Sequence, residues 1–344
     1  MKKGALYLVI VIMMLFIFIG CSNTDSPQTS GEGTSNETSN TQGGKKADLI
    51  YFASGTPGGV YQMLGTGMMK IINENVSDIE LVAVTPAQIA QAPGMLQSGE
   101  AMISIGMACM FERAYEGVDE FAGNKHGDLV QVAGMYDNVY GILTQPKSNI
   151  NDISDITEDT IIGSTATNLI TAKALVDAAG KFDPEKIDYR VMSYSQAAEA
   201  LGDGNIDVTI LTAYPYNGTL DSVATTKGVK FLTISEDVRA KFDEKYPKWK
   251  TQPVPANTYK DQTEDRYAPT IYTVLYANKN LSDDAIYEMV KTIIENVDDL
   301  AAIHPSGQYF TNETTARYLE EGIMDVDRMH PGAVRYFKEA GVIK

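Results

Sequence analysis

The sequence has few of the residues that build disulfide frameworks, zinc sites or nucleic-acid-binding surfaces. It contains two cysteines and three histidines in 344 residues, and the histidines lack metal-ligand spacing. Because Cys21 and Cys109 are the only two cysteines, a framework of several disulfides is excluded. We interpret Cys109 as a small buried apolar residue. The 28 basic residues are outnumbered by 45 acidic ones, for a net charge of −17. This balance argues against a nucleic-acid partner. We expect no metal and no cofactor.

Motifs for catalysis and nucleotide binding are also missing. There is no G-x-S-x-G elbow, and no histidine accompanies a nucleophile motif. The glycine-rich stretch at residues 54–59 lacks the Gly-Lys-Ser/Thr ending of a P-loop and the spacing of a dinucleotide fingerprint. We therefore predict no catalytic residues and no enzyme, with a secreted hydrolase as the less favoured alternative.

The N-terminus has the pattern of a secretory signal. Lys2 and Lys3 precede an apolar run at residues 5–19, which is shorter than a bilayer span. Gly20-Cys21 follows and resembles a bacterial lipobox, which implies a lipoprotein signal peptide at residues 1–20 and lipidation of Cys21. An uncleaved membrane anchor is the alternative. Both interpretations predict an extracytoplasmic protein attached to the bacterial cell membrane.

The segment after Cys21 predicts a disordered tether up to residue 46. It is rich in Ser, Thr, Asn and Gly and has no large apolar residue, so it cannot form a core. A flexible chain of this length reaches about 25–30 Å.

The remaining residues predict an α/β fold with largely parallel sheets. Runs suited to strands lie at residues 49–53, 79–84, 101–106, 130–135, 140–144, 161–163, 189–192, 208–211, 229–234 and 271–277. Helical patterns lie at residues 61–75, 89–97, 109–116, 168–179, 196–202 and 283–296. A strand at residues 140–146 has a turn-rich exit, and a second strand at residues 268–277 follows a long irregular segment at 245–267; together they predict two crossings between lobes. Lobe I then comprises residues 47–145 plus 270–344, and lobe II residues 146–269, with a ligand cleft between them.

The stretch at residues 48–72 is the most specific local signal. A strand, a glycine-rich loop and a helix start follow one another, an arrangement that directs backbone N–H groups at an anion. No arginine falls within this motif, and Arg113 and Arg190 read as solvated surface groups. We therefore predict that a small carboxylate is held by neutral donors.

Several motifs, in order, resemble those of TAXI-type solute receptors, the extracytoplasmic binding proteins of TRAP transporters. They are GTPGGVY at 55–61, QSGEA at 97–101, ERAYEG at 112–117, AEALGDGNID at 198–207, Tyr246-Pro247 with NTY at 257–259, and HPGA at 330–333 with YFKEAG at 336–341. The resemblance implies a two-lobed, type II periplasmic-binding-protein fold with a hinged cleft and no catalysis. It implies capture of a glutamate-like amino acid or dicarboxylate and delivery to an ion-gradient-driven membrane permease.

The resemblance and the loop chemistry together give a set of candidate ligand-binding residues. In lobe I and the turns beside it they are Thr56, Gly58, Gly59, Tyr61, Thr85 and Gln88; in lobe II they are Ser164, Thr165, Thr167, Asn168 and Tyr214. Thr85, Gln88 and the 164–168 group read equally as helix caps. Pro86 and the missing second glycine at 163–168 depart from the family pattern, so the ligand stays open. A receptor for an ABC transporter or a sensor is the other alternative.

Overall fold

The computed structural model describes residues 47–55, 59–86, 89–215, 217–247 and 249–344. Within these ranges the structure contains no helix that is both long and apolar enough to cross a membrane. Residues 45–344 group into one compact unit. Cys21 and the predicted signal and tether lie outside the described residues.

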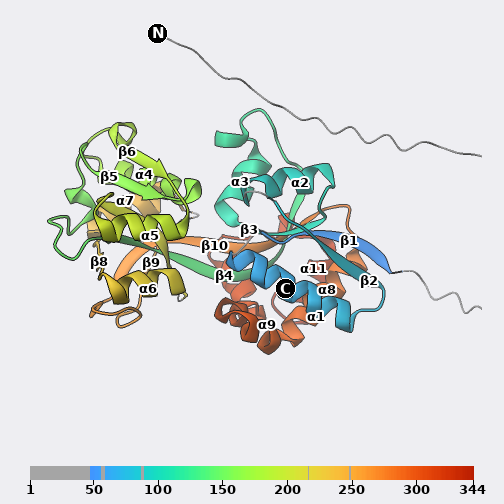
Figure 1. Cartoon of the computed structure of the whole chain (residues 1–344). Coiled ribbons are helices and arrows are strands. Elements are labelled where there is room, and N and C mark those ends of the chain that lie inside the picture. The colour runs from blue at the N-terminus through green and yellow to red at the C-terminus, as the bar shows by residue number, and fades with distance from the viewer. Residues whose placement is uncertain (1–46, 56–58, 87–88, 216, 248) are drawn as a thin grey trace, which may run out of the picture. The chain divides into compact units, whose positions relative to one another are not determined.

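A single mixed sheet organises the chain (Figure 1), with strand order β2-β1-β3-β10-β4-β7-β5-β6. The strands are β1 (Asp48–Ala53), β2 (Ile79–Val84), β3 (Ile103–Met107), β4 (Leu129–Thr144), β5 (Ile161–Ser164), β6 (Asp188–Val191), β7 (Val208–Tyr214), β8 (Lys230–Phe231), β9 (Thr251–Val254) and β10 (Arg266–Asn278). The outer pairs, β1 with β2 and β3 and β5 with β6 and β7, are parallel. The central pairs of β10 with β3 and β4, and of β4 with β7, are antiparallel.

Two long strands join the two halves of the sheet. β4 and β10 run antiparallel through the middle, and in Figure 1 they connect the group around β1–β3 to the group around β5–β9. Both strands are almost entirely buried over their shared length. The predicted crossings at residues 140–146 and 268–277 fall at these strands. The lobe boundaries themselves stay a prediction.

Helices cover each half of the sheet. The β1–β3 half carries α1 (Val60–Asn75), η1 (Ile89–Gln91), α2 (Ala92–Ser98), α3 (Ala108–Glu116), η2 (Asp119–Phe121), α8 (Asp283–Glu295), α9 (Val297–Ile303), η5 (Pro305–Tyr309), α10 (Asn312–Glu320), η6 (Val326–Arg328) and α11 (Pro331–Glu339). The β5–β9 half carries η3 (Ile153–Asp155), α4 (Ala166–Ala179), η4 (Pro184–Lys186), α5 (Tyr194–Asp203), α6 (Gly218–Thr226) and α7 (Glu236–Lys245). Apolar faces such as Leu64, Met68 and Ile72 of α1 pack on the sheet.

Most helices and strands whose apolar residues recur with a clear helical or strand period lie at the predicted positions. β2 and α1 agree within a residue, and α4 ends at Gly180, which adopts a left-handed backbone (φ 66°). The prediction of two strands at 130–135 and 140–144 is wrong, because β4 is continuous between them. The prediction of largely parallel sheets holds only for the outer strands, because sequence patterns do not show direction. α6, α7 and α9–α11 were not predicted.

Candidate functional site

Four tyrosine hydroxyl groups approach one another where β4 crosses between the halves of the sheet; we call Tyr61, Tyr136, Tyr140 and Tyr194 the tyrosine cluster. In the antiparallel ladders Tyr136 pairs with Thr273 and Tyr140 with Thr212, so each pair shares a face. The Tyr61 hydroxyl lies 3.2 Å from Thr273 Oγ1, and its ring meets the Tyr136 ring edge-on at 6.4 Å. Side chains of α1, β4 and β10 thus meet at one point.

The second half of the sheet adds a chain of neutral polar groups. The Tyr194 hydroxyl lies 2.9 Å from Thr212 Oγ1, and Asn168 Nδ2 donates to the Tyr194 hydroxyl at 3.3 Å. Asn168 Nδ2 also donates to the Ile210 carbonyl at 2.8 Å. These contacts bring the Tyr194 hydroxyl and the Asn168 side chain to Thr212, the ladder partner of Tyr140. The Tyr194 ring itself packs against the buried cluster that includes Val139 and Leu211.

Burial changes the pKa of three hydroxyls of the tyrosine cluster. It raises the pKa of Tyr61, Tyr136 and Tyr140 well above the ordinary value of 10.0. The cluster therefore consists of neutral donors and acceptors at physiological pH. Asn138 lies between Tyr136 and Tyr140 on the same face of β4. Its buried Oδ1 has no hydrogen-bond partner among the described residues, which leaves one acceptor available.

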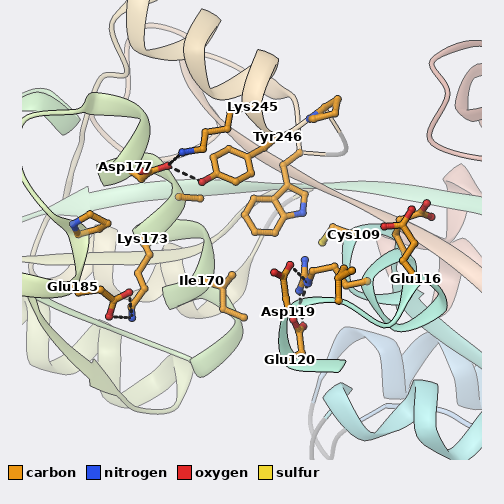
Figure 2. A pocket seen from close by; sticks show the side chains of 17 residues that line it. Cys109, Glu116, Asp119, Glu120, Ile170, Lys173, Asp177, Glu185, Lys245 and Tyr246 are labelled. Carbon is orange, nitrogen blue, oxygen red and sulfur yellow. Dashed lines mark hydrogen bonds and ion pairs between the residues drawn. The ribbon is translucent and has the colours of Figure 1, made fainter. Parts of the chain in front are cut away.

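A cavity of about 750 Å³ lies between α3 and η2 of one half and α4, η4 and the end of α7 of the other (Figure 2). Among the described residues, three cationic side chains line it, and each pairs with a carboxylate of its own half. Arg113 pairs with Glu120, Lys173 with Glu185, and Lys245 with Asp177. Cys109 and Trp249 also line it.

The structure describes some of the predicted lobe I residues. Thr56, Gly58 and Gln88 lie outside the described residues. Gly59 stands at the N-cap of α1, and Tyr61 belongs to the tyrosine cluster. Thr85 is exposed just after the end of β2.

The predicted lobe II residues gather at the start of α4. Thr165 caps this helix by accepting from the Asn168 N–H, as its capping interpretation predicted. The buried Ser164 hydroxyl donates to the Ile210 carbonyl. Thr167 is half-buried on the first turn. Asn168 is the member of this group that contacts the tyrosine cluster.

Tyr214 occupies the opposite face of the sheet. It pairs with Val139, whose side chain points away from the face of Tyr140. Its hydroxyl lies 3.3 Å from that of Tyr309 in η5. Burial raises the pKa of Tyr309 to about 12. Tyr214 therefore joins the two halves behind the tyrosine cluster.

Sequence reasoning missed several residues of this site. Tyr136 and Tyr140 recur with the period of a strand face, and that spacing was the one available signal. The assignment of Arg113 to the solvated surface is wrong, because its side chain is only 15% exposed and lies over the Trp249 ring. Arg190 is a surface group, as predicted.

Comparison with known proteins gives a family and a fold. The NMT1-like family matches residues 52–341. A binding protein component of an ABC phosphonate transporter from Pseudomonas aeruginosa is 13% identical, with 86% of this chain and 97% of that one covered and a TM-score of 0.51. The periplasmic aliphatic sulphonate binding protein of Escherichia coli is 13% identical, with 84% and 78% covered and a TM-score of 0.49. The predicted two-lobed periplasmic-binding-protein fold is confirmed.

Proposed function

We propose that this chain, which belongs to the NMT1-like family, is an extracytoplasmic solute receptor that captures a small carboxylate and delivers it to a membrane permease. The observation that carries the proposal is the tyrosine cluster, where partly buried neutral donors from both halves of the sheet converge. Hydrogen bonds from such donors to an anion are stronger than neutral ones. The starts of α1 and α4 lie beside the cluster and add positive helix ends.

The ligand that suits this site best is a glutamate-like amino acid. The hydroxyls and helix ends serve its carboxylates, and the unpartnered Asn138 Oδ1 serves its ammonium group. The cavity cations Arg113, Lys173 and Lys245 are already paired, so none of these three described side chains has to act as a cationic clamp. A dicarboxylate without the ammonium leaves Asn138 unsatisfied and should bind more weakly.

The motifs that resemble TAXI receptors support a TRAP permease as the partner, with the receptor held at the membrane by lipid on Cys21. The fold similarity to the P. aeruginosa protein, described as a component of an ABC phosphonate transporter, supports an ABC transporter as the second candidate. Dependence of uptake on an ion gradient favours the TRAP partner, and dependence on ATP hydrolysis favours the ABC partner. Cys21→Ala should release the receptor from the membrane fraction.

A thermal-shift screen tests ligand capture directly. The panel contains L-glutamate, its 2-oxo analogue, succinate, methylphosphonate and methanesulfonate. At 100 times its Kd a ligand should raise the unfolding free energy by about 2.7 kcal/mol. We expect L-glutamate to give the largest shift and the 2-oxo analogue a smaller one. A shift with methylphosphonate or methanesulfonate and none with any carboxylate would contradict the proposed ligand class.

A single hydroxyl deletion tests the location of the site. Tyr194→Phe removes the group that joins Asn168 to Thr212 and should weaken L-glutamate binding about tenfold, measured by calorimetry. The matched control is Tyr51→Phe, whose ring is exposed on β1. Equal affinities of the two variants would place the ligand elsewhere.

A further inference from the structure

We propose that Trp249 is a closure latch: its ring bridges the two halves across the mouth of the cavity and holds the cleft shut. The inference rests on the proposed function, because it takes the two halves of the sheet to close around a ligand held at the tyrosine cluster. Trp249 is the single tryptophan of the chain. It follows α7 in the β5–β9 half and lines the cavity opposite α3. Only 6% of its surface is exposed.

The ring is fixed firmly on its own side. It stacks on Tyr246 with the ring centroids 5.5 Å apart and an interplanar angle of 17°, and on Phe242 at 6.4 Å and 29°. The backbone N–H of Trp249 also donates to the Tyr246 carbonyl at 2.8 Å. These contacts stay within the end of α7 and the residues after it, so they persist whether or not the halves separate.

On the other side the ring meets two side chains of α3. The guanidinium of Arg113 lies 5.7 Å from the ring centroid, within the range of a cation–π interaction. The buried Cys109 thiol lines the same cavity and lies close to the Trp249 side chain. Arg113 is held by Glu120 through bonds of 2.9 and 2.7 Å. Each partner is thus positioned within its own half before the two meet.

The two halves meet at the contact between the Trp249 ring and α3, and this contact is where they would separate. Opening of the cleft breaks the contacts of Trp249 with Arg113 and Cys109, and leaves the Tyr246 stack and the Glu120 pair intact. Opening therefore exposes the indole and the thiol together. Because the latch is a contact between two preformed sides, its loss should shift the population toward the open state without unfolding either half.

Alkylation of Cys109 by iodoacetamide measures that population, and peptide mass spectrometry isolates Cys109 from Cys21. In the full chain without added ligand, Trp249→Leu should raise the alkylation rate about five- to thirtyfold, the range expected from losing a desolvated cation–π contact. Arg113→Gln removes the contact from the other side. This variant should raise both the alkylation rate of Cys109 and the acrylamide quenching of Trp249 fluorescence. If Trp249→Leu does not fold, Arg113→Gln therefore still tests the latch.

Phe231→Leu is the matched control. Phe231 is a buried aromatic residue of the β5–β9 half that packs on Tyr259 away from the cavity. Its substitution should leave the alkylation rate near that of the wild type. An unchanged rate in both latch variants, or an equal rise in the control, overturns the latch. A raised rate in the latch variants, together with no carboxylate binding in the thermal-shift screen, leaves the latch standing and refutes the proposed function.

Discussion

Replacing Asp137 with alanine should destabilise the protein, because this carboxylate joins three distant parts of the chain behind the tyrosine cluster. Asp137 lies on β4, one residue from Tyr136 and therefore on the opposite face. Its Oδ1 accepts from Arg317 Nη2 and from the Tyr318 hydroxyl, both at 2.8 Å. Its Oδ2 accepts from Gln252 Nε2 at 2.9 Å. The carboxylate thereby ties α10 and β9 to the central strand.

The expected loss follows from the burial of each partner. Tyr318 is fully buried, and an unsatisfied buried hydroxyl costs about 1–3 kcal/mol. Arg317 is 38% exposed, so water replaces much of its ion pair and the loss there is about 0.2–1 kcal/mol. Gln252 is half-buried and loses about 0.5–1.5 kcal/mol. We expect Asp137→Ala to lower the free energy of unfolding by about 2–5 kcal/mol.

Urea unfolding followed by circular dichroism measures this change. A double-mutant cycle with Tyr318→Phe should give a coupling energy of about 1–2 kcal/mol, because the two groups share a buried hydrogen bond. Asp284→Ala is the matched control: its carboxylate pairs with Arg335 but is 84% exposed, so the change should stay within about 0.5 kcal/mol. An Asp137→Ala loss no larger than that of the control would refute the reasoning.

Two further predictions concern the start of α11. Burial lowers the pKa of His330, whose Nδ1 accepts from the Gly332 N–H at 3.2 Å, so the folded state holds it neutral while the unfolded state charges it below about pH 6.5. The free energy of unfolding should therefore fall as the pH drops from about 6.5 toward the lowered pKa. If the urea midpoint of the His330→Asn variant falls with pH as steeply as that of the wild type, this explanation is wrong. Gly332→Ala should cost about 3 kcal/mol or more, because a Cβ there would lie 2.1 Å from the Asp283 carbonyl oxygen. Gly94→Ala, with its nearest atom at 4.0 Å, should be neutral or stabilise by up to about 1 kcal/mol in the same unfolding assay; equal losses would show that Asp283 moves aside.

The sequence predicted local elements where one period dominates. The apolar residues of α1 recur at helical spacing, and Leu64, Met68 and Ile72 are buried. In α4 the helix ends at Gly180, which has a left-handed backbone. Strand direction was not predictable, because parallel and antiparallel ladders use the same apolar side chains. β4 was divided in two because Asp137 and Asn138 interrupt its apolar run; the structure pairs them with Tyr272 and Ile271 on β10.

The candidate site was only partly predictable for a related reason. Asn168 and Tyr61 were identified because they belong to helix starts with a recognisable loop before them. Tyr194 and Thr212 carry no such motif, and they join the site only because β7 pairs with β4. Tyr214 shows the reverse: a bulge between Val139 and Tyr140 places it on the far face.

What the sequence by itself determined is the set of strands and helices with a clear period, an acidic α/β body with one cysteine, and a series of motifs that resemble one receptor family. These properties follow from composition and from spacing within a few turns of chain. The tertiary structure alone decided which side chains meet. Tyr61 and Thr273 are 212 residues apart in the chain, and Trp249 reaches Arg113 across the cavity. Such contacts depend on strand order and register, which are set by the packing of the whole sheet.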